Sequence, residues 1–103
     1  PQTDDAQPWV RFDLQRPMRA KHIVLSQAVA SRAEANGWNP VKDVKITVNG
    51  KYETLATLHS DAIIPTRIIL NTPRPVISVK VQILSRWNGQ GGYVGWAEIA
   101  LER

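Results

Sequence analysis

The 103-residue sequence contains no cysteine, no long hydrophobic run and no block of like charges. Without cysteine, disulfides and thiolate metal sites are excluded, although the cellular compartment stays open. A membrane-spanning helix needs about 18 consecutive apolar residues, and no run approaches that length. Thirteen Lys and Arg against nine Asp and Glu give a net charge of +4. Because these charges are scattered, they favour mild attraction to acidic partners over a nucleic-acid interface.

Motifs for catalysis are also missing. No G-x-S-x-G nucleophile elbow occurs, and no His, Asp or Glu residues show metal-ligand spacing. NGQGG lacks the Lys-Ser/Thr ending of a phosphate-binding loop. Asp13, Glu98 and Glu102 alternate outward on expected strands, which is typical of solvated or ion-paired carboxylates rather than of a glycosidase pair. We therefore expect that the chain is not an enzyme.

What the sequence does contain is an alternation of apolar and polar residues with a period of two. It predicts strands in PWVRFDL, KHIVLS, VKDVKITV, KYETLATL, TRIIL, VISVKVQIL and GWAEIALE. Asn49-Gly50 is typical of a type I′ hairpin turn between two of them. About seven short strands at near-regular spacing predict a single all-β domain over 1–103, an antiparallel sandwich or jelly roll.

The alternation also assigns side chains to faces. The inner face of VISVKVQIL is expected to hold Ile77, Val79, Val81 and Ile83. KHIVLS is more continuously apolar, as in a strand covered on both faces. Trp96 shares its parity with Glu98 and should face away from the core side of its strand. The stretch 26–36, SQAVASRAEAN, predicts a long loop with at most one helical turn, and such a loop is more often functional than idle.

Three stretches resemble blocks of discoidin-like domains, the fold shared by coagulation factor type C domains and carbohydrate-binding modules of family 32. PWVRFDL resembles their W-x-x-x-D-L opening. NGWNPVKDVKITVNG resembles their N-G-x-[IV]-K-D-Y-x-V-x-x-S-x-D-G hairpin, with Val44 in place of Tyr. ILSRWNGQGGYVGWAEIAL is similar to the closing L-S-x-x-N-G-x-x-x-x-x-x-A-E-I segment of family 32. The blocks follow the family's order. The family's first segment has no counterpart here, and residues 1–7 are either a tail or a remnant of that segment.

The resemblance implies a galactose-binding-like β-sandwich that binds a glycan without catalysis, through loops 27–40 and 85–96. Carried over, the carbohydrate-binding residues are Arg32, Asn36, Trp38, Asn39, Trp87, Asn88, Tyr93 and Trp96. The physical chemistry agrees, because an aromatic ring covers the apolar face of a sugar while Arg and Asn bond its hydroxyls. Tyr93, between glycines, is the preferred aromatic platform.

Several of these residues also have a purely structural interpretation. Trp87 falls on the inward side of its strand's alternation, which favours anchoring of the loop. Trp96 plugs the end of the sandwich or meets a ligand, and Trp38 is exposed or caps the fold. In this interpretation Arg32 pairs with Glu34 or Glu98 in a weak surface ion pair, and Asn88-Gly89 only makes a turn.

Further expectations follow from the resemblance. The missing first segment commonly carries the family's structural calcium, so no metal or other cofactor is expected here. The chain is expected to be an excised or mature piece of an extracellular or periplasmic protein, attached to the catalytic or other domains of a secreted carbohydrate-active enzyme. Its partners would be a glycan and those domains, with no nucleic acid. Two alternatives stay open: an accessory domain without a ligand, and binding of anionic lipid at a membrane surface or of acidic polysaccharide, with Arg32 and Arg86 as a basic rim.

Overall fold

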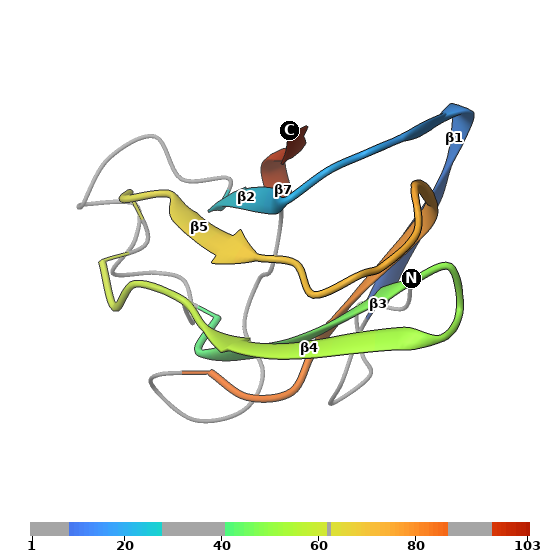
Figure 1. The fold of residues 1–103 in the computed structure, drawn as a ribbon. Helices are drawn as coiled ribbons and strands as arrows, with labels where there is room; N and C mark the ends of the chain where they lie inside the picture. The colour runs from blue at the N-terminus through green and yellow to red at the C-terminus, as the bar shows by residue number, and fades with distance from the viewer. Residues whose placement is uncertain (1–8, 28–40, 62, 87–95) are drawn as a thin grey trace.

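The computed structural model describes residues 9–27, 41–61, 63–86 and 96–103, and these residues form seven β-strands and no helix (Figure 1). The strands are β1 (Trp9–Met18), β2 (His22–Gln27), β3 (Asp43–Val48), β4 (Tyr52–Thr57), β5 (Thr66–Ile69), β6 (Val76–Ile83) and β7 (Trp96–Glu102). The expected all-β class is thereby confirmed. Within the described ranges there is no helix that could span a membrane.

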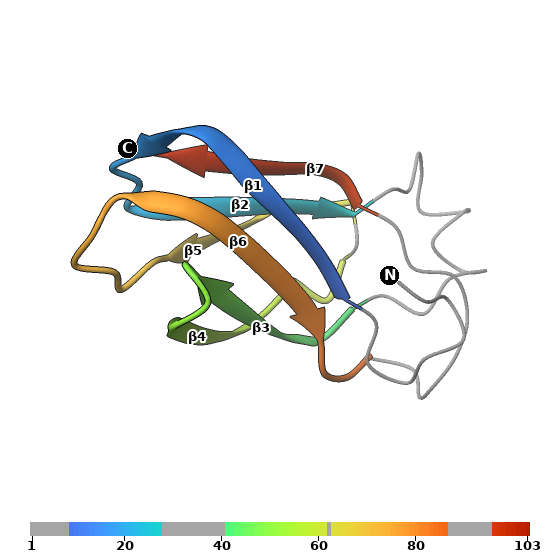
Figure 2. The ribbon, with the colours of Figure 1, turned by 90° about the vertical axis from the view of Figure 1, so that its right-hand side faces the viewer.

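The strands form two antiparallel sheets that lie over one another as a β-sandwich (Figure 2). One sheet has the order β1-β6-β3-β4 and the other has the order β5-β2-β7. The chain crosses between the sheets in the short corner from Met18 to His22. At this corner the N–H of Lys21 donates to the Glu102 carbonyl, and the carbonyl of Lys21 accepts from the N–H of Leu70, both at 2.8 Å. These bonds satisfy the backbone where the chain leaves one sheet and enters the next.

The core lies between the sheets because each strand turns one set of alternate side chains inward. From β3, a central strand of the four-stranded sheet, Val44, Ile46 and Val48 are buried. From β2, the central strand of the other sheet, Ile23 and Leu25 join the same cluster. Burying one such side chain contributes about 1.5–3 kcal/mol before opposing terms. The burial of these inward side chains is therefore the main contribution that holds the two sheets together.

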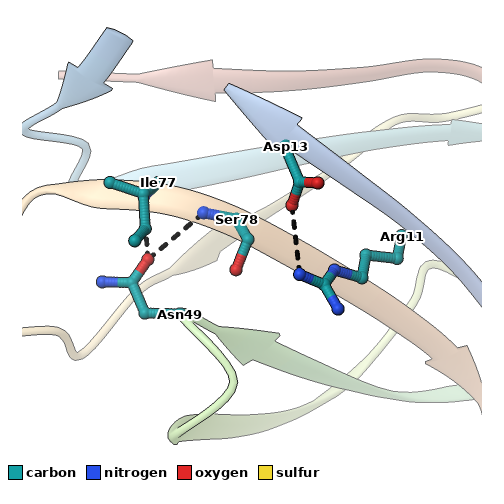
Figure 3. A network of polar contacts seen from close by, with 5 residues as sticks. All are labelled: Arg11, Asp13, Asn49, Ile77 and Ser78. Carbon is teal, nitrogen blue, oxygen red and sulfur yellow. Dashed lines mark hydrogen bonds and ion pairs between the residues drawn. The ribbon is translucent and has the colours of Figure 1, made fainter. Parts of the chain in front are cut away.

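The hairpin turn between β3 and β4 follows the predicted type. Asn49 has φ 56° and Gly50 has φ 67°, both in the left-handed region that a type I′ turn requires. The Asn49 side chain also reaches β6, where its Oδ1 accepts hydrogen bonds from the N–H groups of Ile77 at 2.8 Å and Ser78 at 3.2 Å (Figure 3). Its Nδ2 donates to the Pro75 carbonyl at 3.0 Å. Asn49 therefore fixes a turn and the start of a neighbouring strand at once.

The predicted alternation of VISVKVQIL is wrong at its first member. Ile77 is 51% exposed, whereas its neighbour Val76 is fully buried. The cause is an irregular register between β1 and β6: Asp13 pairs with Ser78 but Met18 pairs with Val76, so residues 14–17 lie opposite Ile77 alone. An irregularity of this kind shifts the inward side of a strand by one residue.

The expectation that KHIVLS is covered on both faces is also wrong. Ile23 and Leu25 are buried, but Val24 and Ser26 between and after them are only half-buried. The described part of the opposite sheet packs against one side of β2, and this side receives the larger side chains. The apolar Val24 is accommodated on the partly exposed side, where β-branched residues still favour a strand.

Candidate functional site

The ends of four described segments meet at one end of the sandwich, where the two expected binding segments leave and rejoin the described residues. Gln27 pairs with Trp96 across β2 and β7, and Val41 forms an isolated bridge with Arg86. The Oε1 of Gln27 accepts a hydrogen bond from the N–H of Val41 at 3.1 Å. This bond joins the end of a strand in one sheet to the segment that enters β3 of the other. The starts and ends of segments 28–40 and 87–95 are thus held together.

Most of the predicted binding residues lie within those segments and therefore outside the described residues. They are Arg32, Asn36, Trp38, Asn39, Trp87, Asn88 and Tyr93. The long loop expected at 26–36 likewise lies outside them, apart from Ser26 and Gln27, which end β2. The structure thus places the ends of both predicted loops together, while the contacts of these side chains stay predictions.

Trp96 is described, and the prediction that it faces away from the core side is wrong. It is half-buried and packs against the hydrophobic core cluster. Ser26 pairs with Glu98 but Gln27 pairs with Trp96, so Ala97 is an extra residue on β7. This bulge breaks the parity that linked Trp96 to Glu98. The geometry supports the interpretation of Trp96 as a plug at the end of the sandwich.

The expected basic rim is wrong for one of its two members. Arg86 is only 7% exposed, and its bridge partner Val41 is fully buried. A guanidinium is rarely buried to this extent unless other groups satisfy it. Arg86 therefore belongs, with Gln27, Val41 and Trp96, to the packed group of segment ends that we call the loop base. Arg32 lies outside the described residues.

Asp43 ties three neighbouring segments together beside this base. Its Oδ1 accepts a hydrogen bond from the Thr57 hydroxyl at 2.7 Å, and its Oδ2 accepts one from the Ser85 hydroxyl at 2.9 Å. The Asp43 carbonyl also accepts from the N–H of Leu84 at 2.8 Å. These groups border an open hollow of about 540 Å³ next to Leu55. Because the carboxylate and hydroxyls bond one another, we assign them to fixing the ends of the strands.

The hydrogen bond from Thr57 lowers the pKa of Asp43 most, and the Ser85 hydrogen bond lowers it further; burial opposes them, and the Lys42 charge adds the smallest lowering. The folded pKa is depressed, so this carboxylate stabilises the fold above its unfolded pKa, and the contribution disappears as pH falls through the folded value. We expect the free energy of unfolding to fall below about pH 4. Urea denaturation across this range should show a weaker acid dependence in Thr57→Val. An identical acid dependence in the variant would contradict the assignment.

A third segment reaches the same end of the sandwich, and sequence reasoning missed it. The N–H of Leu58 donates to the Lys42 carbonyl at 2.7 Å, next to Val41. Ile63 and Ile64, which follow in the connection to β5, are 37% and 40% exposed. The available signal was AIIP, an adjacent pair of large apolar residues outside any alternating run.

Comparison of the chain with known proteins identified no relative. No protein-family model, curated protein or solved structure matches the chain. The resemblance to discoidin-like domains therefore depends on the three quoted stretches alone. Among the described residues, no group of three or more His, Asp or Glu side chains could hold a metal ion.

Proposed function

We propose that the chain is a non-catalytic carbohydrate-binding module whose glycan lies between segments 28–40 and 87–95. The observation that carries this proposal is the meeting of the four segment ends at Gln27, Val41, Arg86 and Trp96. Loops positioned by a rigid scaffold are the usual place for recognition. Two segments that share one base are able to present residues from both to a single ligand.

The two segments are proposed to make different contacts with the glycan. Arg32 and Asn36 supply fixed donors and acceptors for sugar hydroxyls, and Tyr93 supplies a ring for the apolar face of the sugar. A shallow polar site offers few buried contacts, so we expect Kd values from about 10 µM to 1 mM. Weak modules of this kind serve to hold a larger enzyme on its substrate, and we therefore place the chain in an extracellular or periplasmic carbohydrate-active enzyme.

The first test is a titration of the chain with galactosides, N-acetylglucosamine and fucosides. We expect saturable binding that Tyr93→Ala and Arg32→Ala each weaken by about tenfold or more, since each removes a main contact. Arg74→Ala is the matched control, because Arg74 lies in the connection before β6, near the Asn49 turn and away from the loop base. A folded chain that binds none of these sugars would contradict the proposal and favour the accessory role.

A second candidate function is supported by the exposed pair Ile63 and Ile64. Apolar side chains at a loop end, in a chain of net charge +4, suit insertion into an anionic lipid surface. Sedimentation with vesicles of phosphatidylcholine, with and without phosphatidylserine, tests this function. Binding that requires phosphatidylserine and is lost in the double variant Ile63→Ser/Ile64→Ser would establish it, and equal sedimentation of variant and wild type would exclude this site.

A further inference from the structure

A second surface lies on the four-stranded sheet, on the side away from the core. We call it the outer face and define it by Trp9, Arg11, Lys45, Thr47, Glu53, Leu55, Lys80 and Gln82. The register arranges these residues in two rows across the strands. Arg11, Lys80, Thr47 and Glu53 are successive partners in one row, and Trp9, Gln82, Lys45 and Leu55 are successive partners in the other. Neighbouring strands lie about 4.8 Å apart, so the second row extends over roughly 14 Å.

The outer face places two like charges opposite one another, where a sheet gains no stability from them. Arg11 and Lys80 are direct partners on β1 and β6, and like charges directly opposite one another destabilise a sheet. The acid nearest Arg11 is Asp13 on the same strand, at 3.3 Å (Figure 3). Both side chains of this pair are more than half exposed, so the pair stabilises little. A costly pair of cations between the edge strand β1 and its neighbour β6 is a feature that a bound anion would explain.

An aromatic ring adjoins these cations. Trp9 is 41% exposed, and the ammonium of Lys80 lies 4.9 Å from the centre of its ring. Gln82, the direct partner of Trp9, adds an amide that both donates and accepts hydrogen bonds. Cation, ring and amide therefore stand side by side on neighbouring strands.

We propose that the outer face binds an acidic polysaccharide, specifically a chain of uronic acid residues. Its carboxylates would pair with Arg11 and Lys80, its hydroxyls would bond Gln82, and a sugar ring would pack on Trp9. A polymer fits better than a single sugar because the two rows form a continuous strip across the sheet. This site uses other residues than the proposed loop site and does not depend on it.

Hydrogen-bond acceptors and a single aromatic ring favour a polyuronate over a nucleic acid on this face. Asp13 and Glu53, with Glu53 at 3.8 Å from the ammonium of Lys45, place carboxylates beside the cations. These carboxylates would accept hydrogen bonds from the many hydroxyls of a sugar chain. Single-stranded nucleic acids also stack successive bases on several aromatic rings, whereas Trp9 is the one aromatic residue among those that define this face.

The test is binding of the whole chain to polygalacturonate, with fully methyl-esterified polygalacturonate as the neutral control and poly(dT) as the nucleic-acid control. Arg11→Gln/Lys80→Gln removes the opposed cations. Lys51→Gln/Arg74→Gln lowers the net charge equally at exposed positions in turns and also removes one cation–ring contact, that of Lys51 with Tyr52 at 5.5 Å. We expect the first variant to lose affinity by about tenfold or more and the second by less than about twofold. Because a like-charge pair is relieved, the first variant should melt no lower than the second.

The outcomes separate this site from the loop site. Binding that falls with added salt, fails with the esterified chain and survives Tyr93→Ala supports the outer face. Equal losses in the two double variants would show an effect of net charge alone and would overturn the proposal. Tighter binding of poly(dT), lost in the first variant, would replace the polyuronate with a nucleic acid. Absence of binding by the wild type would also overturn it, while leaving the loop site intact.

Discussion

Replacing Asn49 with alanine should lower the free energy of unfolding by about 2–3 kcal/mol. Alanine at φ 56° is strained in the left-handed region, which accounts for about 1 kcal/mol. The remainder comes from the N–H groups of Ile77 and Ser78, which lose the acceptor that the Asn49 side chain provides. Urea denaturation followed by tryptophan fluorescence measures the change.

Two further variants separate the turn from the side chain. Asn49→Gly removes the backbone strain but also the side-chain bonds, so about 1–2 kcal/mol should still be lost. Asn49→Asp keeps the acceptor oxygens but loses the donor to the Pro75 carbonyl, 3.0 Å away, and should lie between wild type and alanine. A glycine variant as stable as the wild type would show that the bonds to β6 contribute nothing.

The positions of the strands along the sequence were predictable because alternation is a local property. Val44, Ile46 and Val48 alternate with polar residues, and Asn49-Gly50 supplies backbone geometry that few other dipeptides adopt easily. Each inference needs only the residues themselves. The two sheets and their antiparallel strands then follow from how such strands bury one face.

The wrong face assignments share a physical cause. The exposure of Ile77 and the inward packing of Trp96 both occur where the register between two strands shifts. A shift depends on the partner strand, and counting along one strand cannot reveal it. The burial of Arg86 likewise depends on its bridge to Val41, a contact between residues far apart in the sequence.

The sequence predicted where the two candidate loops lie along the chain, whereas the meeting of their ends depends on strand pairing. Loops 27–40 and 85–96 were assigned from a resemblance, and their described ends do meet at one base. The exposed pair Ile63 and Ile64 at the same end was missed, because the strand pattern gave it no role. The outer face was missed for a different reason: the opposition of Arg11 and Lys80 exists only once the strands are paired.

Leu25→Ala should destabilise the chain by about 3 kcal/mol, whereas Leu55→Ala should change stability by less than about 0.5 kcal/mol. The same side chain is truncated in both variants and both positions lie in strands, but Leu25 is 1% exposed and Leu55 is 70% exposed. Truncation of Leu25 loses its transfer free energy and leaves a cavity between the sheets, while truncation of Leu55 leaves only solvent. Urea denaturation of the two variants beside the wild type gives both values.

The same pair of variants links the core to the proposed glycan site. Leu25 lies two residues before Gln27, whose side chain holds the N–H of Val41 at the base of both segments. A cavity under this end of β2 should therefore raise hydrogen exchange at the Val41 N–H in Leu25→Ala and leave it unchanged in Leu55→Ala. Glycan affinity should fall with it, because a looser base increases the entropy lost when both segments order on a ligand. Equal stability of the two variants would contradict the packing of β2 against the opposite sheet, and with it the common base on which the loop site depends.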